Sequence, residues 1–312
     1  MKVYHDIKQL PAFKNAVITI GTFDGVHQGH QQIIRQLLKE ASAVDGTAVV
    51  ITFFPHPKLV VGKEKADTAP IYLLNTPEEK YALLHAHGLE HVVVVPFDTA
   101  FAMQPADAYI KDFLVNYFHP HTIIIGYDHR FGKNRQGDYR LLEEKAEVYN
   151  YTVQEIPEHV LKDVTISSTK VRSALLAGDN DTAAAYLGYR YFFSGTVIMG
   201  NQLGRTIGYP TANLHIDNAE KLVPANGVYA VEIVLSERVF GGMMNIGVRP
   251  TVDGTTRVIE VNIFDFNEQI YGSILKVTLI KKLRSEIKFT GLEALKEQLA
   301  LDQVNALAVL TI

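Results

Sequence analysis

The stretch AVITIGTFDGVHQGH, residues 16–30, decides the fold of the first half of the chain. Its first five residues are an apolar, mostly β-branched run that predicts a buried strand. Glycines, an aspartate and two histidines follow directly, and a helical pattern begins after them. Because backbone amides at the start of a helix favour anions, this strand, loop and helix predict a phosphate-binding loop. A plain strand-to-helix turn with incidental histidines is the alternative.

Similar apolar runs recur up to about residue 157 and alternate with helical patterns. They are TAVVITFF (47–54), HVVVVPF (91–97), TIIIGYD (122–128) and the weaker YTVQEIP (151–157). One helix should begin at Thr76, followed by Pro77 and by Glu79, which completes a capping box. This alternation predicts an α/β domain, a parallel sheet with helices on both faces. Ligands bind beyond the carboxyl ends of the strands in such sheets.

The pattern changes near Gly188. Strand-like segments then follow without long helices between them: YFFSGTVIM (191–199), VYAVEIVL (228–235), GGMMNIG (241–247), RVIEVNIFDF (257–266) and ILKVTLIKKL (274–283). They predict an antiparallel barrel or sandwich, and a terminal helix capped by Thr290 should pack on it. Strand alternation places Glu260 between core-forming neighbours. We therefore expect two domains, residues 1–187 and 188–312.

Composition narrows the class of protein. The chain has 312 residues, of which 47% are hydrophobic and 21% charged, as is ordinary for a soluble protein of two domains. It has no cysteine, which excludes disulfides and thiolate metal sites. The first residues, 1–15, have no long apolar core, so we expect no signal peptide, and no run in the sequence reaches about 18 apolar residues. The net charge of −4 gives no broad attraction to nucleic acid. We expect small-molecule partners, a cytoplasmic location and no membrane or nucleic-acid partner, while the oligomeric state stays open.

Another candidate phosphate loop follows the last strand of the first half. In ISSTKVR (166–172), Ser167 and Ser168 can cap a helix and also donate to phosphate, while Lys170 and Arg172 supply positive charge. An ordinary N-cap with a solvated basic face is the alternative. One such loop before the first helix and one after the last strand are more specific together than either is alone.

In the second half, GRTIGYPTAN (204–213) combines glycines with hydroxyl and amide side chains. It is not a P-loop, because it lacks the Gly-Lys-Ser/Thr ending. Thr211 and Asn213 are instead typical of metal and phosphate ligands supplied from a loop.

Taken together, these motifs resemble those of the prokaryotic bifunctional riboflavin kinase/FAD synthetase family, whose first half belongs to the nucleotidyltransferase superfamily. The motifs occur in the family's order: GTFDGVHQGH (21–30), TFFPHP (52–57), GYDHRFGKNRQGD (126–138), ISSTKVR (166–172), GRTIGYPTAN (204–213), NIGVRPT (245–251) and LRSEIKF (283–289). The resemblance implies a Rossmann-like nucleotidyltransferase domain followed by a β-barrel. His129 stands where the family commonly has an aromatic residue, and Asn262 where it commonly has histidine.

For the first domain the resemblance implies adenylyl transfer from ATP to FMN, giving FAD and pyrophosphate. The nucleophile is an ionised phosphate, so the site needs alignment and charge stabilisation rather than a general base. His27 and His30 are the implied catalytic residues. The implied ATP ligands are Gly21, Phe23, Asp24, His27, His30, Ser167, Ser168, Thr169 and Arg172. The implied flavin ligands are Phe53, Pro55, Pro57, Asp128 and Phe131.

For the second domain it implies phosphoryl transfer from ATP to riboflavin, giving FMN. The nucleophile is an alcohol, so a general base becomes useful, and Glu260 matches the family's catalytic glutamate. The implied ATP ligands are Gly204, Arg205, Thr211 and Asn213, and the implied Mg²⁺ ligands are Thr211 and Asn213. The alternative for Glu260 is an outward-facing residue paired with Arg249 or Arg257.

Two other functions remain open from sequence alone. The first is a nucleotidyltransferase that acts on a different phosphate acceptor, with the barrel merely assisting. The second is a flavin or nucleotide sensor with one inert half, although such a protein loses catalytic residues before binding ones.

Overall fold

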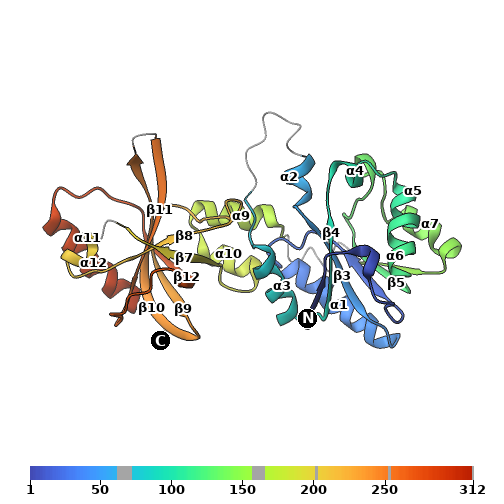
Figure 1. The fold of residues 1–312 in the computed structure, drawn as a ribbon, viewed down its shortest axis with the longest axis horizontal. Helices are drawn as coiled ribbons and strands as arrows, with labels where there is room; N and C mark the ends of the chain where they lie inside the picture. The colour runs from blue at the N-terminus through green and yellow to red at the C-terminus, as the bar shows by residue number, and fades with distance from the viewer. Residues whose placement is uncertain (62–71, 157–165, 201–202, 252–253, 311–312) are drawn as a thin grey trace. The chain divides into compact units, whose positions relative to one another are not determined.

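The computed structural model describes residues 1–61, 72–156, 166–200, 203–251 and 254–310. The chain divides into two compact units, Met1–Ser167 and Ser168–Ile312 (Figure 1). Within the described ranges, no helix is both long enough and apolar enough to cross a membrane.

The first unit is built on a sheet of six parallel strands, which confirms the predicted α/β class. In space their order is β1-β4-β3-β2-β5-β6. Their bounds are β1 (Lys2–Tyr4), β2 (Val17–Ile20), β3 (Ala48–Phe54), β4 (His91–Pro96), β5 (Thr122–Gly126) and β6 (Thr152–Ile156). The order reverses at β2, since β3 and β4 lie on one side of it and β5 and β6 on the other. Such a switch point is where open α/β sheets bind ligands.

Helices cover both faces of this sheet because its strands are apolar on both sides. Val17 belongs to a core with α1 (Gln28–Ala43) and α3 (Pro77–Ala86), whereas its neighbour Ile18 belongs to a core with η3 (Tyr109–Val115) and α7 (Tyr139–Tyr149). The shorter helices are η1 (Ile7–Gln9), α2 (Pro57–Val61), α4 (Thr99–Ala102), α5 (Ala106–Ala108), α6 (Asn116–Phe118) and η4 (Lys133–Arg135).

The predicted start of α3 is confirmed. Thr76 is the N-cap, Pro77 occupies the first helical position, and Glu79 completes a capping box. The Oγ1 of Thr76 accepts from the amide of Glu79 at 3.3 Å, and the Glu79 carboxylate accepts from the amide of Thr76 at 3.0 Å. Two amides that the first turn leaves without helical partners are thereby satisfied.

The second unit holds a closed antiparallel barrel in the order β10-β11-β8-β7-β12-β9, as predicted. The strands are β7 (Phe192–Ile198), β8 (Ala212–His215), β9 (Gly227–Leu235), β10 (Arg238–Thr251), β11 (Gly254–Ile263) and β12 (Ile274–Arg284). The helices of this unit are α9 (Ser168–Ala177), α10 (Asn180–Leu187), α11 (Leu203–Thr206) and α12 (Leu292–Leu307).

Helix α9 and the residues just after it pack against the segment before β9 and against β12 of the barrel. The carbonyl of Leu175 accepts from the amide of Ala225 at 3.0 Å, and Gly178 lies so close to Lys282 that an added Cβ would come within 2.4 Å of its Nζ. This describes packing, and the functional boundary after Leu187 stays a prediction.

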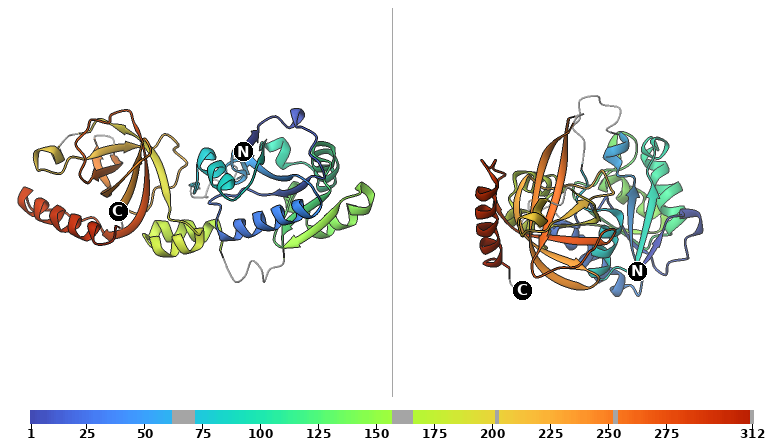
Figure 2. Two further views of the ribbon diagram at one scale, coloured as in Figure 1. Left: turned by 90° about the horizontal axis from the view of Figure 1, so that it is seen from below. Right: turned by 60° about the vertical axis from the view of Figure 1, so that its left-hand side comes forward.

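Helix α12 lies along the outside of the barrel (Figure 2). It is anchored by Ala306, which packs with Ala230 and Met243 from the strands. The prediction that Thr290 caps this helix was wrong. The helix begins later than predicted, so Gly291 is the N-cap, and no side chain accepts from the amides of the first turn.

Candidate active sites

The two predicted catalytic histidines lie together at the start of α1, beyond the carboxyl end of β2. His27 is the N-cap of α1, and its Nδ1 accepts from the amide of His30 at 3.4 Å. The two imidazole rings stack with centroids 3.7 Å apart and planes 15° apart. The ring of Phe23 lies 4.9 Å from that of His30 and closes the other side. The sequence therefore folds into a rigid pair of imidazoles at a helix N-terminus, where anions are favoured.

The loop that carries these histidines has a strained backbone. Phe23 has a φ of 50° and Val26 a φ of 36°, in a region that side chains rarely adopt and a β-branched residue least of all. Asp24, only 4% exposed, holds the loop in place because its carboxylate accepts from the amide of Leu74 at 2.8 Å. With its carboxylate engaged in this way Asp24 orders the loop, and its role as an ATP ligand stays a prediction. Such strain persists only where the surroundings hold it, as at binding and catalytic loops.

His30 is a neutral imidazole at physiological pH. Burial lowers its pKa well below the usual value, and the positive charges of His27 and Lys80 lower it further. Its Nδ1 is buried and has no hydrogen-bond partner among the described residues. A neutral ring with a polar atom left over can donate to or accept from a ligand without the cost of burying a charge.

The predicted flavin ligands lie at the ends of β3 and β5, but they are not equally accessible. Phe131 is only 5% exposed and stacks with Tyr109, with ring centroids 4.9 Å apart. Phe53 is half-buried against Phe97. By contrast, the remaining predicted ligands are partly or fully exposed: Pro55, Pro57 and Asp128. In this arrangement Phe131 contributes a core contact, and its role toward flavin stays a prediction.

The second predicted phosphate loop begins α9. Ser168 is the first residue of the helix, Thr169 is exposed, and Arg172 is partly exposed. Ser167 is the last residue of the first compact unit, whereas Ser168, Thr169 and Arg172 belong to the second. Their role as ATP ligands of the first domain therefore stays a prediction.

The register of the barrel sets Glu260 between two asparagines. Glu260 of β11 pairs with Asn213 of β8 on one side and with Asn245 of β10 on the other. Directly opposed residues of antiparallel strands point to the same face of the sheet. Three polar side chains from strands far apart in sequence are thus brought to one face, while the neighbours of Glu260 on β11, Ile259 and Val261, are buried.

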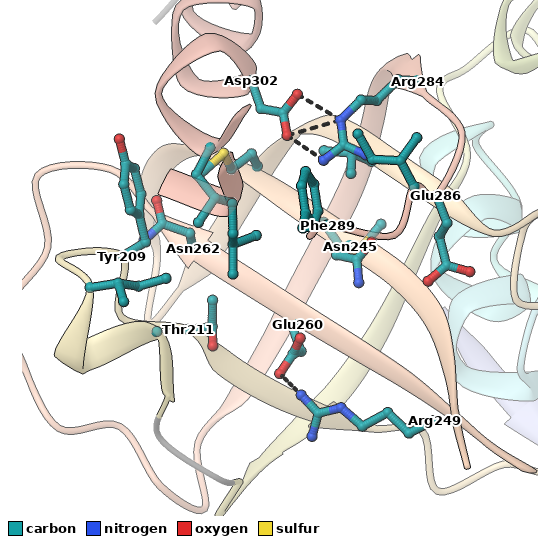
Figure 3. Close-up of a pocket in the computed structure, with 18 residues that line it drawn as sticks. Tyr209, Thr211, Asn245, Arg249, Glu260, Asn262, Arg284, Glu286, Phe289 and Asp302 are labelled. Carbon is teal, nitrogen blue, oxygen red and sulfur yellow. Dashed lines mark hydrogen bonds and ion pairs between the residues drawn. The ribbon is translucent and has the colours of Figure 1, made fainter. Parts of the chain in front are cut away.

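This face forms one wall of a pocket, and α12 with the segment before it forms the other (Figure 3). The barrel side supplies the polar groups of Thr211, Asn245, Glu260 and Asn262. The opposite side combines the apolar side chains of Ile287, Phe289, Leu295 and Leu299 with the charged groups of Arg284, Glu286 and Asp302. A pocket with an apolar slot and a few convergent polar groups fits a flat aromatic ligand that carries a polar tail.

Glu260 is held in place by Arg249. The Nη2 of Arg249 lies 2.6 Å from Oε1 of Glu260, and the two side chains are 40% and 21% exposed. The ion pair between Glu260 and Arg249, one of the two alternatives considered from sequence, is therefore present. The Glu260 carboxylate also lines the pocket, so it does not simply face outward into solvent. Arg257 instead donates to the carbonyls of Val223 and Pro224.

Only two of the four predicted nucleotide ligands of the second domain line the pocket. Gly204 and Thr211 line the pocket, whereas Arg205 is exposed and, like Asn213, is absent from the lining. The Asn213 side chain packs against Gly200, where an added Cβ would come within 2.1 Å of its Nδ2. Asn262, where the family commonly has histidine, donates to the carbonyl of Pro210 at 2.7 Å and holds the segment before Thr211.

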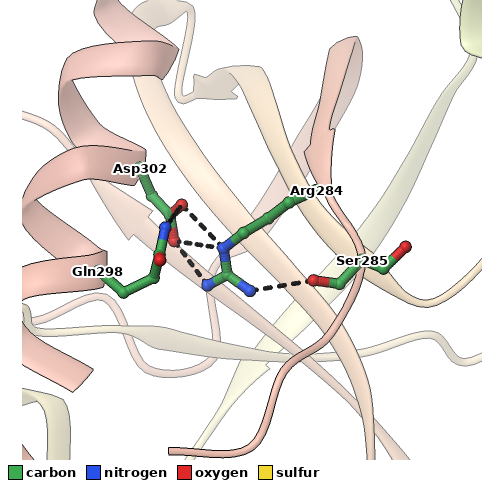
Figure 4. A network of polar contacts seen from close by, with 4 residues as sticks. All are labelled: Arg284, Ser285, Gln298 and Asp302. Atoms are coloured by element: carbon green, nitrogen blue, oxygen red, sulfur yellow. Dashed lines mark hydrogen bonds and ion pairs between the residues drawn. The ribbon is translucent and has the colours of Figure 1, made fainter. Parts of the chain in front are cut away.

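The opposite wall holds an ion pair that the sequence motifs do not reveal (Figure 4). Arg284 of β12 donates three hydrogen bonds of 2.7 to 3.1 Å to the carboxylate of Asp302 on α12. Gln298 also donates to Asp302 at 2.9 Å, and Arg284 donates to the carbonyl of Ser285 at 3.0 Å. The motif LRSEIKF contains Arg284, but nothing in the sequence marks its partner 18 residues later.

The comparisons with known proteins agree with this arrangement. The FAD synthetase family matches residues 10–170, and the riboflavin kinase family matches residues 187–310. A curated relative from Haemophilus influenzae, named bifunctional riboflavin kinase/FMN adenylyltransferase, is 38% identical over 297 residues, covering 95% of this chain and 94% of its own. The chain belongs to the bifunctional riboflavin kinase/FMN adenylyltransferase family.

Two further relatives extend this family likeness. A Bacillus subtilis relative of the same name is 36% identical over 309 residues, covering 97% of this chain and 95% of its own. A crystal structure from Streptococcus pneumoniae, of a protein named macrolide-efflux protein, matches with a TM-score of 0.86 and 30% identity, over 98% of both chains.

Proposed function

We propose that the chain makes FMN from riboflavin and ATP in its second half and FAD from FMN and ATP in its first half. The observation that carries the kinase half is the register of β8, β11 and β10, which sets Glu260 between Asn213 and Asn245 and places Glu260 and Asn245 in a pocket with apolar side chains on its opposite wall. The stacked histidines at the N-terminus of α1 support the adenylyltransferase half.

In the kinase half, Glu260 is the general base. Its carboxylate takes the proton of the primary alcohol of riboflavin as the alcohol oxygen bonds to the γ-phosphorus of ATP and ADP leaves. Arg249 keeps that carboxylate pointed along the pocket wall. Asn262 fixes the segment before Thr211, so the Thr211 hydroxyl keeps its place at the rim.

Mg²⁺ fits the side chains offered here. Over residues 1–61, 72–156, 166–200, 203–251 and 254–310, no group of three His, Asp or Glu side chains is placed to hold a metal. Thr211 and Asn213 offer neutral oxygens, and Mg²⁺ commonly keeps several waters and binds through few protein ligands plus substrate phosphates. When bound, it neutralises charge on the ATP phosphates.

In the adenylyltransferase half, no base is required. The FMN phosphate is already ionised, so His27, His30 and the first amides of α1 need only orient ATP and stabilise charge at the α-phosphorus. A neutral His30 meets this need as a hydrogen-bond donor.

A cytoplasmic location stays a prediction.

The test separates the two halves within one chain. Purified protein is incubated with ATP, Mg²⁺ and either riboflavin or FMN, and riboflavin, FMN and FAD are separated by chromatography over time. Glu260→Gln should stop FMN formation and leave FMN-to-FAD conversion intact, while His30→Ala should do the reverse. Loss of both activities in folded Glu260→Gln would refute the separation of sites. FAD formation from FMN also excludes a different phosphate acceptor, and tight flavin binding without turnover would favour a sensor.

A further inference from the structure

Lys80 is a cation that belongs to none of the sequence motifs. It lies beside the loop between β2 and α1, residues 21–27, which is called the histidine loop below. Lys80 lies in α3, four residues after the N-cap Thr76. Its Nζ donates to the carbonyl of Thr22 at 3.3 Å and to Oγ1 of Thr52 at 3.0 Å. Thr22 belongs to the histidine loop and Thr52 to β3, so the ammonium joins the loop, the sheet and α3.

The position of Lys80 is costly for a lysine. Burial lowers its pKa to about 8, although the nearby carboxylate of Asp24 opposes that shift. A cation near the N-terminus of a helix also faces the positive end of the helix dipole. A solvated lysine elsewhere on α3 would avoid both costs. The arrangement therefore indicates a role that needs a positive charge at this point.

The groups around Lys80 show what that charge faces. Asp24 approaches from the histidine loop, and His30, whose pKa the Lys80 charge helps to lower, approaches from α1. At pH 7 His30 is neutral, whereas Lys80, whose pKa is about 8, is still mostly protonated. Lys80 therefore supplies a positive charge next to the stacked rings at that pH. The two acceptors of its ammonium group, Thr22 and Thr52, lie just after β2 and near the carboxyl end of β3, on the edge of the sheet where α/β proteins bind ligands.

We propose that Lys80 is a positioning residue for adenylyl transfer, whose ammonium fixes the histidine loop through the Thr22 carbonyl and keeps a positive charge beside the loop that binds the anionic phosphates. The inference rests on the proposed function of the first half. It adds a residue from α3 to a site that the motifs confine to the loops after β2, β3 and β5 and the segment 166–172.

The experiment compares Lys80→Met and Lys80→Arg with Lys39→Met as a matched control, since Lys39 is an exposed lysine on α1. Conversion of FMN to FAD is measured with ATP varied, and riboflavin phosphorylation in the same samples reports the other half. Lys80→Met should lower kcat/KM for ATP in FAD formation by about 10- to 100-fold, the usual effect of losing a charged hydrogen-bond donor. Lys39→Met should match the wild type in both reactions.

A pH profile separates positioning by charge from a structural role. FAD formation by the wild type should fall as pH rises above about 8, because Lys80 then loses its proton. Lys80→Arg stays protonated and should lack this fall, even if its activity at pH 7.5 is lower. This comparison decides the matter also where Lys80→Met fails to fold in a thermal scan.

The outcomes are distinguishable. Equal kcat/KM values in Lys80→Met and Lys39→Met, or the same alkaline fall in Lys80→Arg as in the wild type, would overturn the inference and leave the proposed function standing. A wild-type protein that makes no FAD from added FMN would overturn the proposed function of the first half and this inference with it.

Discussion

Replacing Asp302 with leucine should loosen α12 and, through it, one wall of the proposed kinase pocket. The Asp302 side chain is only 1% exposed and receives three hydrogen bonds from Arg284, whose side chain is 20% exposed. Without the carboxylate, the largely buried guanidinium of Arg284 would lose its charged partner on α12.

The size of the effect follows from the geometry. Removing one partner of a buried ion pair commonly costs about 3–5 kcal/mol. Arg284 keeps some access to water and its bond to the carbonyl of Ser285, so the lower figure applies, about 3 kcal/mol. A loss of that size raises the open fraction of α12 by about 100-fold.

Hydrogen exchange of the α12 amides is the suitable assay. The chain has no tryptophan to report on this helix by fluorescence, and its two compact units make a single unfolding transition a poor measure. Exchange in α12 should become about 100-fold faster in Asp302→Leu. Glu297→Leu is the matched control, because it removes an exposed carboxylate from the same helix and should leave exchange unchanged.

A double variant separates the buried charge from lost packing. Arg284→Met combined with Asp302→Leu removes both charges, so exchange should return most of the way toward the wild-type rate. The KM for riboflavin should rise in Asp302→Leu, since Leu295 and Leu299 of α12 line the pocket, while FMN-to-FAD conversion stays unchanged. Unchanged α12 exchange in Asp302→Leu, or a double variant no better than it, would refute this account of the wall.

Three further predictions concern single side chains. Burial lowers the pKa of His129 to about 4, against the pull of Asp128, so the unfolded chain binds a proton below pH 6.5 that the folded chain does not; this stability is present above pH 6.5 and lost toward pH 4. Between pH 7 and pH 5 about 1.5 pH units of this window are crossed, so His129→Phe should remove about 2 kcal/mol of acid destabilisation. Thermal unfolding at the two pH values checks this, and an equal acid loss in both proteins would contradict it. Thr76→Ala should destabilise α3 by about 1 kcal/mol, measured as faster exchange of its first amides, with an unchanged rate as the contrary result. Thr211→Val should raise the Mg²⁺ concentration needed for riboflavin phosphorylation by about 10-fold or more without altering FAD formation, and identical Mg²⁺ titrations would count against Thr211 as a ligand.

Local patterns predicted most of the fold because each depends on a few neighbouring residues. The apolar runs became β2 to β6, and the Thr76 capping box formed as expected. The strands that were missed, β1 and β8, are 3 and 4 residues long, too short for alternation to be read from the sequence. Their pairing with longer strands, rather than local propensity, makes them strands.

The parts of the site that escaped prediction depend on contacts between distant segments. Strand alternation gives the face of Glu260 but not the residues opposite it, since register is set by pairing across the barrel. Asn245 was therefore missed as a neighbour, and so were Asp302 as the partner of Arg284 and Lys80 as a neighbour of the histidine loop. A lysine in the first turns of a helix looks solvated until the loop it touches is placed.

The two proposed sites differ in the way that their nucleophiles require. An ionised phosphate needs charge stabilisation without proton removal. The histidine loop and the start of α1 offer a neutral imidazole and helix amides, and Lys80 of α3 adds a positive charge beside them. The carboxylate of the loop, Asp24, is engaged with the amide of Leu74. An alcohol needs a base, and the barrel holds a carboxylate, Glu260, in the wall of a pocket that faces Ile287 and Phe289. A base in the first site would add nothing, since the FMN phosphate has no proton to give up. This difference in chemistry is the reason that single substitutions should silence one half of the chain and leave the other active.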